Sequence, residues 1–322
     1  MIDRPGRLRD DGGVSNPPLP RPFRFGVVTT NGTDRSRRRW TEYAREVESL
    51  GFAVLLVADH YGNGTVCTPR LAAAASVTST IRLGSYVYDN DFRHPVLLAR
   101  EAAEIDVLSN GRMELGIGAG WSKDEYDSVG IKFDTGPTRV DRYEDAVGII
   151  RALHSGTTVT HDGPHYQLAS CALSVEPVQR PIPLLLGGGG PRMTRFAANT
   201  ADTIAFVPRS LPGGGIDPSE FSESAFDAKI AILNSATATR PDGGPERGIL
   251  AFETHRSIDQ VPDNDWAPRD VIAGGPYALV GDTAGIVDTL LERRERWGLS
   301  YWTCWEENID ILAGAVAALA GT

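Results

Sequence analysis

The feature that most restricts the fold of this sequence is a regular alternation of short apolar runs and longer segments with helical periodicity, which begins at Phe23. The runs are almost uninterrupted in apolar character, which is typical of strands covered on both faces. Six runs are clear: 23–29, 53–58, 81–88, 113–118, 182–186 and 203–207. Two more, Ile249–Glu253 and Tyr301–Trp305, bring the number of expected strands to eight.

Helical segments separate these runs, at 38–50, 71–80, 97–108, 141–153 and 193–200. In the first of them, apolar side chains recur at helical spacing from Trp40 to Leu50, and Gly51 follows as a stop. Parallel strands need crossovers of this kind. Eight expected strands in 322 residues favour an α/β fold that closes into a (β/α)₈ TIM barrel over an open doubly wound sheet.

Two kinds of segment lie outside this alternation. Residues 1–22 are rich in Arg, Asp, Gly and Pro and lack apolar periodicity, so we expect a disordered or loosely attached N-terminal arm. Residues 23–322 are expected to form a single barrel domain with two insertions. One, near 157–168, is predicted to be a hairpin that turns at Asp162-Gly163. The other, near 208–257, is irregular and rich in Gly and Pro, and it is interpreted as a surface insertion or a lid.

Composition excludes several classes of function. The chain carries 32 basic and 42 acidic side chains, and a net charge of −10 argues against a general nucleic-acid binder. No apolar run reaches the roughly 18 residues of a membrane span. Three widely spaced cysteines form neither a disulfide framework nor a metal site, and the N-terminus lacks the apolar core of a secretory signal. We therefore expect a cytoplasmic enzyme that acts on a small molecule.

In a barrel of this kind the active site lies where the strands end. Asp59-His60 follows the second run, and a histidine there either transfers protons near neutral pH or is a hydrogen-bonded structural residue. The third run is followed by the polar segment 88–95. The fourth leads into 116–121 (GIGAGW), which lacks the last glycine of a dinucleotide fingerprint, so a Rossmann fold is rejected.

The strongest local signal is Gly187-Gly188-Gly189-Gly190, which stands between the fifth run and a helix. Bare backbone N–H groups at the positive end of a helix dipole form a phosphate site. Arg192 could add a fork of donors to the same anion. The alternative is a long flexible turn, although a turn requires only one or two glycines.

Taken in chain order, these motifs resemble a known family. They are Asp59-His60, the segment IRLGSYVYDNDFRHPVLLAREAAEIDVLSNGRMELGIGAGW, and PIPLLLGGGGPRM. The order resembles the luciferase-like superfamily of flavin and deazaflavin oxidoreductases, and within it the branch that uses coenzyme F420. The resemblance extends from Phe23 almost to the C-terminus.

The resemblance implies a luciferase-like barrel with insertions that forms a homodimer and holds an isoalloxazine-type ring over the strand ends. It also implies a bulge in the third strand, with a non-proline cis peptide bond around Tyr86-Val87 that supports the ring. Asp89 would lie near the polar edge of the ring. Tyr86 departs from the family, which often has a small residue at this position.

The remaining implied site residues come from three other strand ends. Ala119 and Gly120 match contacts to the ring or its side chain, and Gly187–Gly190 matches the phosphate loop. His60 matches a position that handles a proton beside the transferred hydride, and Asp59 would orient its imidazole. The expected reaction is hydride transfer between F420 and a small organic substrate.

Three alternatives remain open at this stage. Reduced FMN could replace F420 in a monooxygenase, since its phosphate suits the same glycines. The acidic tail of F420 calls for cations, for which the candidates are Arg93, Arg139, Arg142, Arg192 and Arg195. A hydrolase or lyase acting on a phosphorylated small molecule would use the same acids and histidine without a redox cofactor. A barrel that binds flavin without turnover, as a partner subunit, is the third alternative.

Overall fold

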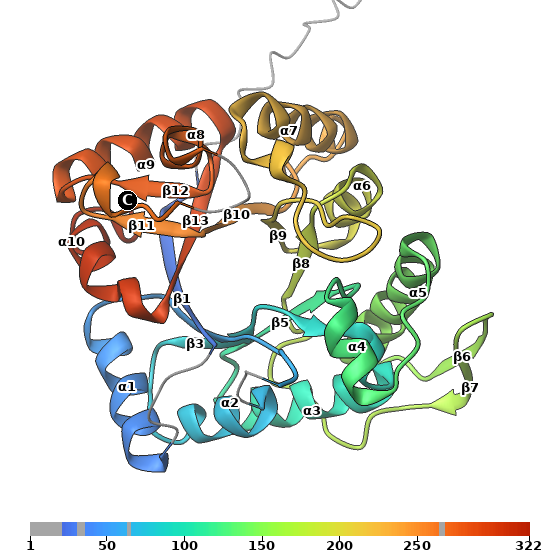
Figure 1. The fold of residues 1–322 in the computed structure, drawn as a ribbon. Coiled ribbons are helices and arrows are strands. Elements are labelled where there is room, and N and C mark those ends of the chain that lie inside the picture. The colour runs from blue at the N-terminus through green and yellow to red at the C-terminus, as the bar shows by residue number, and fades with distance from the viewer. Residues whose placement is uncertain (1–20, 31–35, 63–65, 264–267) are drawn as a thin grey trace, which may run out of the picture.

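The computed structural model describes residues 21–30, 36–62, 66–263 and 268–322. Residues 1–20 of the expected N-terminal arm lie outside this part of the chain. From β1 to α10 the described chain alternates strands with helices, and the helices lie on the outside of the ring of strands (Figure 1).

Eight parallel strands form a closed barrel, which confirms the predicted fold class. They are β1 (Arg24–Thr29), β2 (Val54–Val57), β3 (Arg82–Ser85), β5 (Met113–Gly118), β8 (Leu184–Gly188), β9 (Thr203–Phe206), β10 (Glu246–Ala251) and β13 (Leu299–Trp305). Pairing of β1 with β13 and of β3 with β5 closes the ring. The short strand β4 (Tyr88–Asp89) follows β3 and also pairs with β5.

The helices that surround the barrel follow the strands in the order expected of a (β/α)₈ fold. They are α1 (Arg37–Ser49), α2 (Cys67–Ala75), α3 (Pro95–Leu108), α5 (Gly136–His154), α6 (Pro191–Thr200), α7 (Glu223–Thr237), α9 (Thr283–Trp297) and α10 (Ile309–Leu319). Two short helices, α4 (Lys123–Val129) and α8 (Arg269–Gly274), lie in the connections. None of the helices in the described ranges is long and apolar enough to span a bilayer.

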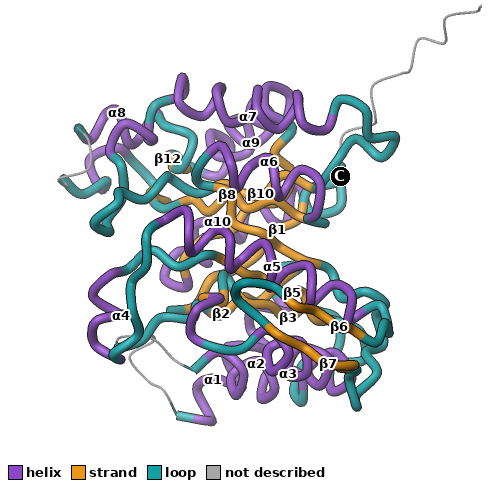
Figure 2. Tube along the Cα trace, turned by 90° about the vertical axis from the view of Figure 1, so that its right-hand side faces the viewer, coloured by secondary structure: helices purple, strands orange, loops and turns teal. Residues whose placement is uncertain are grey.

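The insertions differ in part from the sequence-based expectation. The hairpin consists of β6 (Val159–Asp162) and β7 (Gln167–Cys171), and it projects from the right-hand side of the molecule in Figure 1, the side that faces the viewer in Figure 2. The stretch 208–257 is not irregular throughout, because it contains α7 and the barrel strand β10. It also contains β11 (Glu253–His255), which pairs with β12 (Ala278–Val280). Loops remain before α7, where they include the short 3-10 helix Pro218–Phe221, and between α7 and β10.

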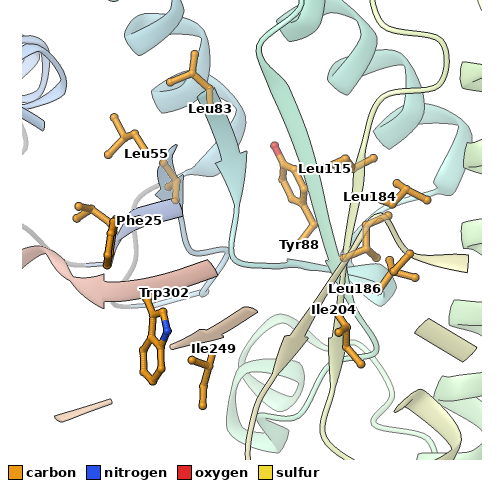
Figure 3. Packing of buried hydrophobic residues seen from close by; sticks show 14 of the residues in the cluster. Phe25, Leu55, Leu83, Tyr88, Leu115, Leu184, Leu186, Ile204, Ile249 and Trp302 are labelled. Carbon is orange, nitrogen blue, oxygen red and sulfur yellow. The ribbon is translucent and has the colours of Figure 1, made fainter. Parts of the chain in front are cut away.

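The apolar side chains form two layers, which explains why the strands read as continuous apolar runs. Alternate residues of the strands, such as Phe25, Leu55, Leu184 and Trp302, point outward into the core beneath the helices (Figure 3). The residues between them point into the barrel, where Val28, Leu56, Leu185 and Tyr301 form a second cluster. Both faces of the sheet are therefore buried.

Charged side chains close the amino-terminal end of the barrel. Glu114 of β5 is 5% exposed and forms ion pairs with Arg24 of β1, at 2.8 Å, and with Arg82 of β3. Arg24 also lies 3.1 Å from Glu246 of β10, and its guanidinium carbon is 4.5 Å from the centre of the Tyr301 ring. With this end closed by ion pairs, the opposite end is the one available for a ligand.

Candidate active site

The residues singled out by the sequence follow β2, β3, β5 and β8, which are four consecutive strands of the barrel. Because all barrel strands are parallel, their carboxyl ends meet at one face. The structure thus brings Asp59-His60, Tyr86-Val87, Ala119-Gly120 and the glycine quartet to the same end of the barrel.

The third strand breaks at the predicted position. The Tyr86-Val87 peptide bond is cis, which confirms the expected non-proline cis bond. The glycines of β5 make room for this bulge: a Cβ on Gly116 would lie 2.0 Å from the Ser85 carbonyl oxygen, and one on Gly118 would lie 2.7 Å from Val87. The side chain of Tyr86 packs against the cluster inside the barrel. The bulge is therefore built jointly by β3 and β5.

His60 is held by a carboxylate that the sequence analysis missed. Its Nδ1 lies 2.7 Å from Oε1 of Glu125 in α4, and the other carboxylate oxygen accepts the backbone N–H of Tyr61 at 3.1 Å. The Trp121 ring meets the imidazole edge-on with centroids 6.0 Å apart, and Trp121 is 43% exposed, as a pocket wall would be. Because Glu125 engages Nδ1, Nε2 is the nitrogen left for a substrate.

Asp59 does not orient His60, which corrects the role expected for it. Its carboxylate forms a two-pronged ion pair with Arg93, at 2.5 and 3.1 Å, and accepts the backbone N–H of Asp89 at 3.2 Å. Asp59 therefore fastens the polar segment after β3 to the end of β2. Arg93, one of the candidates for an anionic tail, is neutralised by this pair.

Asp89, which is expected near the polar edge of the ring, lies next to Gly120. Its Oδ1 accepts the hydroxyl of Tyr126 at 2.9 Å and the backbone N–H of Asp91 at 2.9 Å. A Cβ on Gly120 would lie 2.6 Å from Oδ2 of Asp89 and 1.9 Å from the Tyr126 hydroxyl, and Gly120 has a φ of +75°, so no other residue fits there. Burial raises the pKa of Asp89 to about 7 in spite of these hydrogen bonds.

This pKa predicts that Asp89→Asn is more stable than the wild type at about pH 8. A carboxyl group whose pKa rises on folding contributes stability that is fully present below its ordinary pKa of 3.8 and is lost as pH rises through about 7. The asparagine oxygen can still accept both hydrogen bonds. Thermal unfolding of both proteins from about pH 4 to pH 8 measures the effect. Parallel pH profiles for the two proteins would contradict the assignment.

The glycine quartet splits into two pairs. Gly188 and Gly189 are needed for packing, because their Cβ atoms would lie 3.0 Å from Ile204 and 3.2 Å from the carbonyl oxygen of Pro208. At Gly187 and Gly190 a Cβ would meet nothing within 4 Å. Gly187 and Gly188 also belong to β8, which ends two residues later than predicted.

Open space at Gly190 lies at the start of α6, where Pro191 has no N–H and Gly190 forms no side-chain cap. The first backbone N–H groups of a helix have no acceptor within it. A phosphate could therefore approach these groups closely, which fits the predicted phosphate loop.

Arg192 differs from its expected role as an anion ligand. Its guanidinium binds Glu144, with contacts at 2.9 and 2.6 Å, and Asp141 at 2.7 Å, so its charge is directed to α5. Arg142 pairs with Asp91 and Asp134, and Arg139 donates to backbone carbonyls. Of the five candidate arginines, Arg139 and Arg195 form no ion pair within the described residues, whereas Arg93, Arg142 and Arg192 do.

A cleft of about 580 Å³ opens at the carboxyl ends of β1, β2 and β13, and His60 lines it. Tyr61, Asp124, Glu125, Trp305 and Glu307 also line it. A volume of this size suits a small organic substrate. The imidazole held by Glu125 is thus exposed to a space that can hold a reacting molecule.

The profile of the luciferase-like monooxygenase family matches residues 22–216, which is more than half of the chain. The chain belongs to this family. It is 28% identical to the F420-dependent glucose-6-phosphate dehydrogenase of Microbacterium testaceum, over 81% of this chain and 75% of that protein. It is 34% identical to the 5,10-methylenetetrahydromethanopterin reductase of Archaeoglobus fulgidus, over 78% of each.

A solved structure confirms the luciferase-like fold. An F420-dependent secondary alcohol dehydrogenase, in complex with an F420-acetone adduct, superposes with a TM-score of 0.72 over 92% of this chain and 99% of that one, at 18% identity. The match of the family model to residues 22–216 confirms the superfamily inferred from the strand-end motifs.

Two side chains that contact the candidate site residues were missed by the sequence analysis. Glu125 and Tyr126 stand in α4, and they reach His60 and Asp89 respectively. A signal was present, because Asp124 and Glu125 open a helix directly after the glycine-rich end of the fourth strand. Acidic residues in a first turn are, however, also common for electrostatic reasons.

Proposed function

We propose that this chain is an oxidoreductase that uses coenzyme F420 to transfer a hydride to or from a small organic substrate. The observation that carries the proposal is the His60–Glu125 pair in a cleft at the end of a luciferase-like barrel that also has the cis bond and the open glycine positions. The relatives named for F420-dependent reactions support it.

The chain's own residues fit such a cofactor. The Tyr86-Val87 bulge would support the ring, with Asp89, Ala119 and Gly120 beside it. The positions of Gly187 and Gly190 leave space that a Cβ would fill. Because these groups follow adjacent strands, a long molecule can extend from the start of α6 across β5 and β3 toward His60. Bound F420 supplies a ring carbon that accepts or gives up a hydride.

The proton that accompanies this hydride is assigned to His60. With Glu125 accepting from Nδ1, the imidazole presents Nε2 as a base when neutral and as an acid when protonated. The carboxylate fixes the tautomer and the ring orientation. Trp305 lines the surrounding cleft and Trp121 contacts the imidazole edge-on, so the two rings limit the access of water to His60.

We also propose a cytoplasmic homodimer. All three cysteines are free, and Cys67 and Cys304 are buried, as expected of a protein kept reduced. Apolar side chains are exposed on α3, where Leu97 is 52% and Leu108 is 56% exposed, and Val66, which precedes the neighbouring helix α2, is 68% exposed. Light scattering of the purified protein measures the mass.

The test of the cofactor is titration of the apoprotein with F420 and with FMN, followed by fluorescence quenching. We expect saturable binding of F420 with at least about tenfold higher affinity than FMN. Tighter binding of FMN would favour the monooxygenase alternative. Absence of binding by both would contradict the proposed function.

A pair of glycine variants locates the cofactor. Gly190→Leu introduces a side chain into open space, with backbone angles that any residue adopts (φ −104°), so the fold should be retained. We expect it to weaken F420 binding about tenfold or more by occupying the cradle. Gly148→Leu, on the exposed face of α5, is the matched control and should bind normally. Equal affinities would place the phosphate elsewhere.

A further inference from the structure

The cleft beside His60 has an unusual balance of charge. Three carboxylates line it, those of Asp124, Glu125 and Glu307. Apart from His60, the other described lining residues are uncharged, and none of them is Lys or Arg. A concave surface with charges of one sign concentrates the field inside it. The cleft therefore repels anions and attracts cations.

Two of these carboxylates are not neutralised by a neighbouring side chain. Glu125 is engaged by His60 and by the backbone of Tyr61. Asp124 and Glu307 are exposed at the rim, and no ion pair to either is formed within the described residues. The ammonium group next to Asp124 in sequence, that of Lys123, pairs with Asp127 instead. Arg93, the cation after β3, is held by Asp59.

Aromatic rings line the same cleft. Trp305 donates its indole N–H to the Phe252 carbonyl oxygen at 3.1 Å, which fixes the ring, and Tyr61 is 57% exposed at the mouth. Aromatic faces attract organic cations, and this attraction adds to that of nearby carboxylates. A phosphate group would enter the same space without a counter-charge, at the cost of its hydration.

We propose that this cleft selects substrates by charge: it prefers an organic molecule with a protonated amine to a neutral one, and it rejects a phosphorylated one. This proposal concerns the substrate of the site described above and so rests on the proposed function. It separates the chain from its relative in Microbacterium testaceum, whose name specifies a sugar phosphate.

The test uses three probes that share one ring and differ in charge: cyclohexylamine, cyclohexanol and cyclohexyl phosphate. Their binding is measured by calorimetry on the F420-loaded protein and on the apoprotein. We expect the amine to bind about tenfold more tightly than the alcohol, and the phosphate to bind more weakly than both. The preference should shrink in high salt because exposed charges are screened.

A charge-removing variant identifies the source of the preference. In Asp124→Asn/Glu307→Gln the difference between amine and phosphate should fall about tenfold. The control is Asp288→Asn/Glu292→Gln on the exposed face of α9, which changes the net charge equally and should keep the wild-type order.

Three results would overturn the proposal: phosphate binding as tight as that of the amine, no binding by any probe, or an unchanged preference in the double variant. Failure of the proposed function is a separate result. In that case F420 does not bind, while the order of the probes on the apoprotein still reports whether the cleft selects by charge.

Discussion

Replacing His60 with alanine is expected to lower turnover about 100-fold or more while F420 affinity changes less than about twofold. His60 lines the cleft and offers Nε2, whereas the positions assigned to the cofactor follow β3, β5 and β8. A group that only transfers a proton affects the chemical step and not the binding of the cofactor. Single-turnover kinetics with one substrate of the protein and titration with F420 measure the two quantities separately.

Glu125 is expected to act through His60. Glu125→Gln keeps an acceptor for Nδ1–H but removes the charge, so its turnover should be about tenfold lower than that of the wild type. The turnover of Glu125→Ala, which has no acceptor, should be lower still. Added imidazole should partly restore the turnover of His60→Ala, since a free imidazole can occupy the space left by the missing side chain. Asp127→Asn, in the same helix but outside the cleft lining, where Asp127 pairs with Lys123, is the control and should retain full turnover. A His60→Ala protein with wild-type turnover would remove the histidine from the mechanism.

The barrel could be predicted from sequence because every strand is buried on both faces, which leaves a continuous apolar run as its signature. The end of the barrel that holds the site followed from the same inference, since parallel strands share one carboxyl end. The glycines at 116 and 118 were recognised as places of close backbone approach, and the structure shows that the approaching group is the β3 bulge.

What failed was inference from neighbours in sequence. Asp59 and His60 are adjacent at the end of a strand, where successive side chains point to opposite sides. Asp59 therefore meets Arg93, while His60 meets Glu125, which is 65 residues away. This pairing depends on how α4 packs at the carboxyl ends of the strands, and no local sequence pattern predicts it.

The irregular insertion was misjudged for a different reason. Phe226, Ile230 and Leu233 give α7 a helical period and are buried, but clusters of Gly and Pro on both sides obscured the signal. Strand β10 was placed three residues late because it begins with Glu246 and Arg247. Glu246 belongs to the ion pairs that close that end of the barrel, and Arg247 donates hydrogen bonds to Trp297 and Asn234.

Those ion pairs give the prediction with the largest effect on stability. Glu114→Ala is expected to lower the free energy of unfolding by about 3–5 kcal/mol, because it leaves the guanidinium groups of Arg24 and Arg82 without their common carboxylate. Urea unfolding at neutral pH measures the change. The control is Glu176→Ala, which breaks an exposed ion pair with Arg180 and should cost less than about 1 kcal/mol.

In the same cluster Arg24 pairs with two buried carboxylates, Glu114 and Glu246, whose pKa values shift in opposite directions. Burial opposes ionisation of Glu114, but Arg24 and Arg82 outweigh it and lower its pKa below the ordinary 4.5. Burial raises the pKa of Glu246, because the attraction of Arg24 is too weak to offset the loss of hydration of the carboxylate. Stability from Glu114 is thus present above about pH 4.5 and is lost as pH falls through its lowered pKa.

For Glu246 the sign is reversed: its contribution is complete below about pH 4.5 and is lost as pH rises through its raised pKa. At neutral pH, Glu114→Gln should therefore destabilise the protein, and Glu246→Gln should leave its stability unchanged or increase it. Equal losses in the two variants would show that Arg24 and Arg82 do not distinguish the carboxylates. A larger loss for Glu246→Gln would place the essential ion pair between β1 and β10 instead of between β1, β3 and β5.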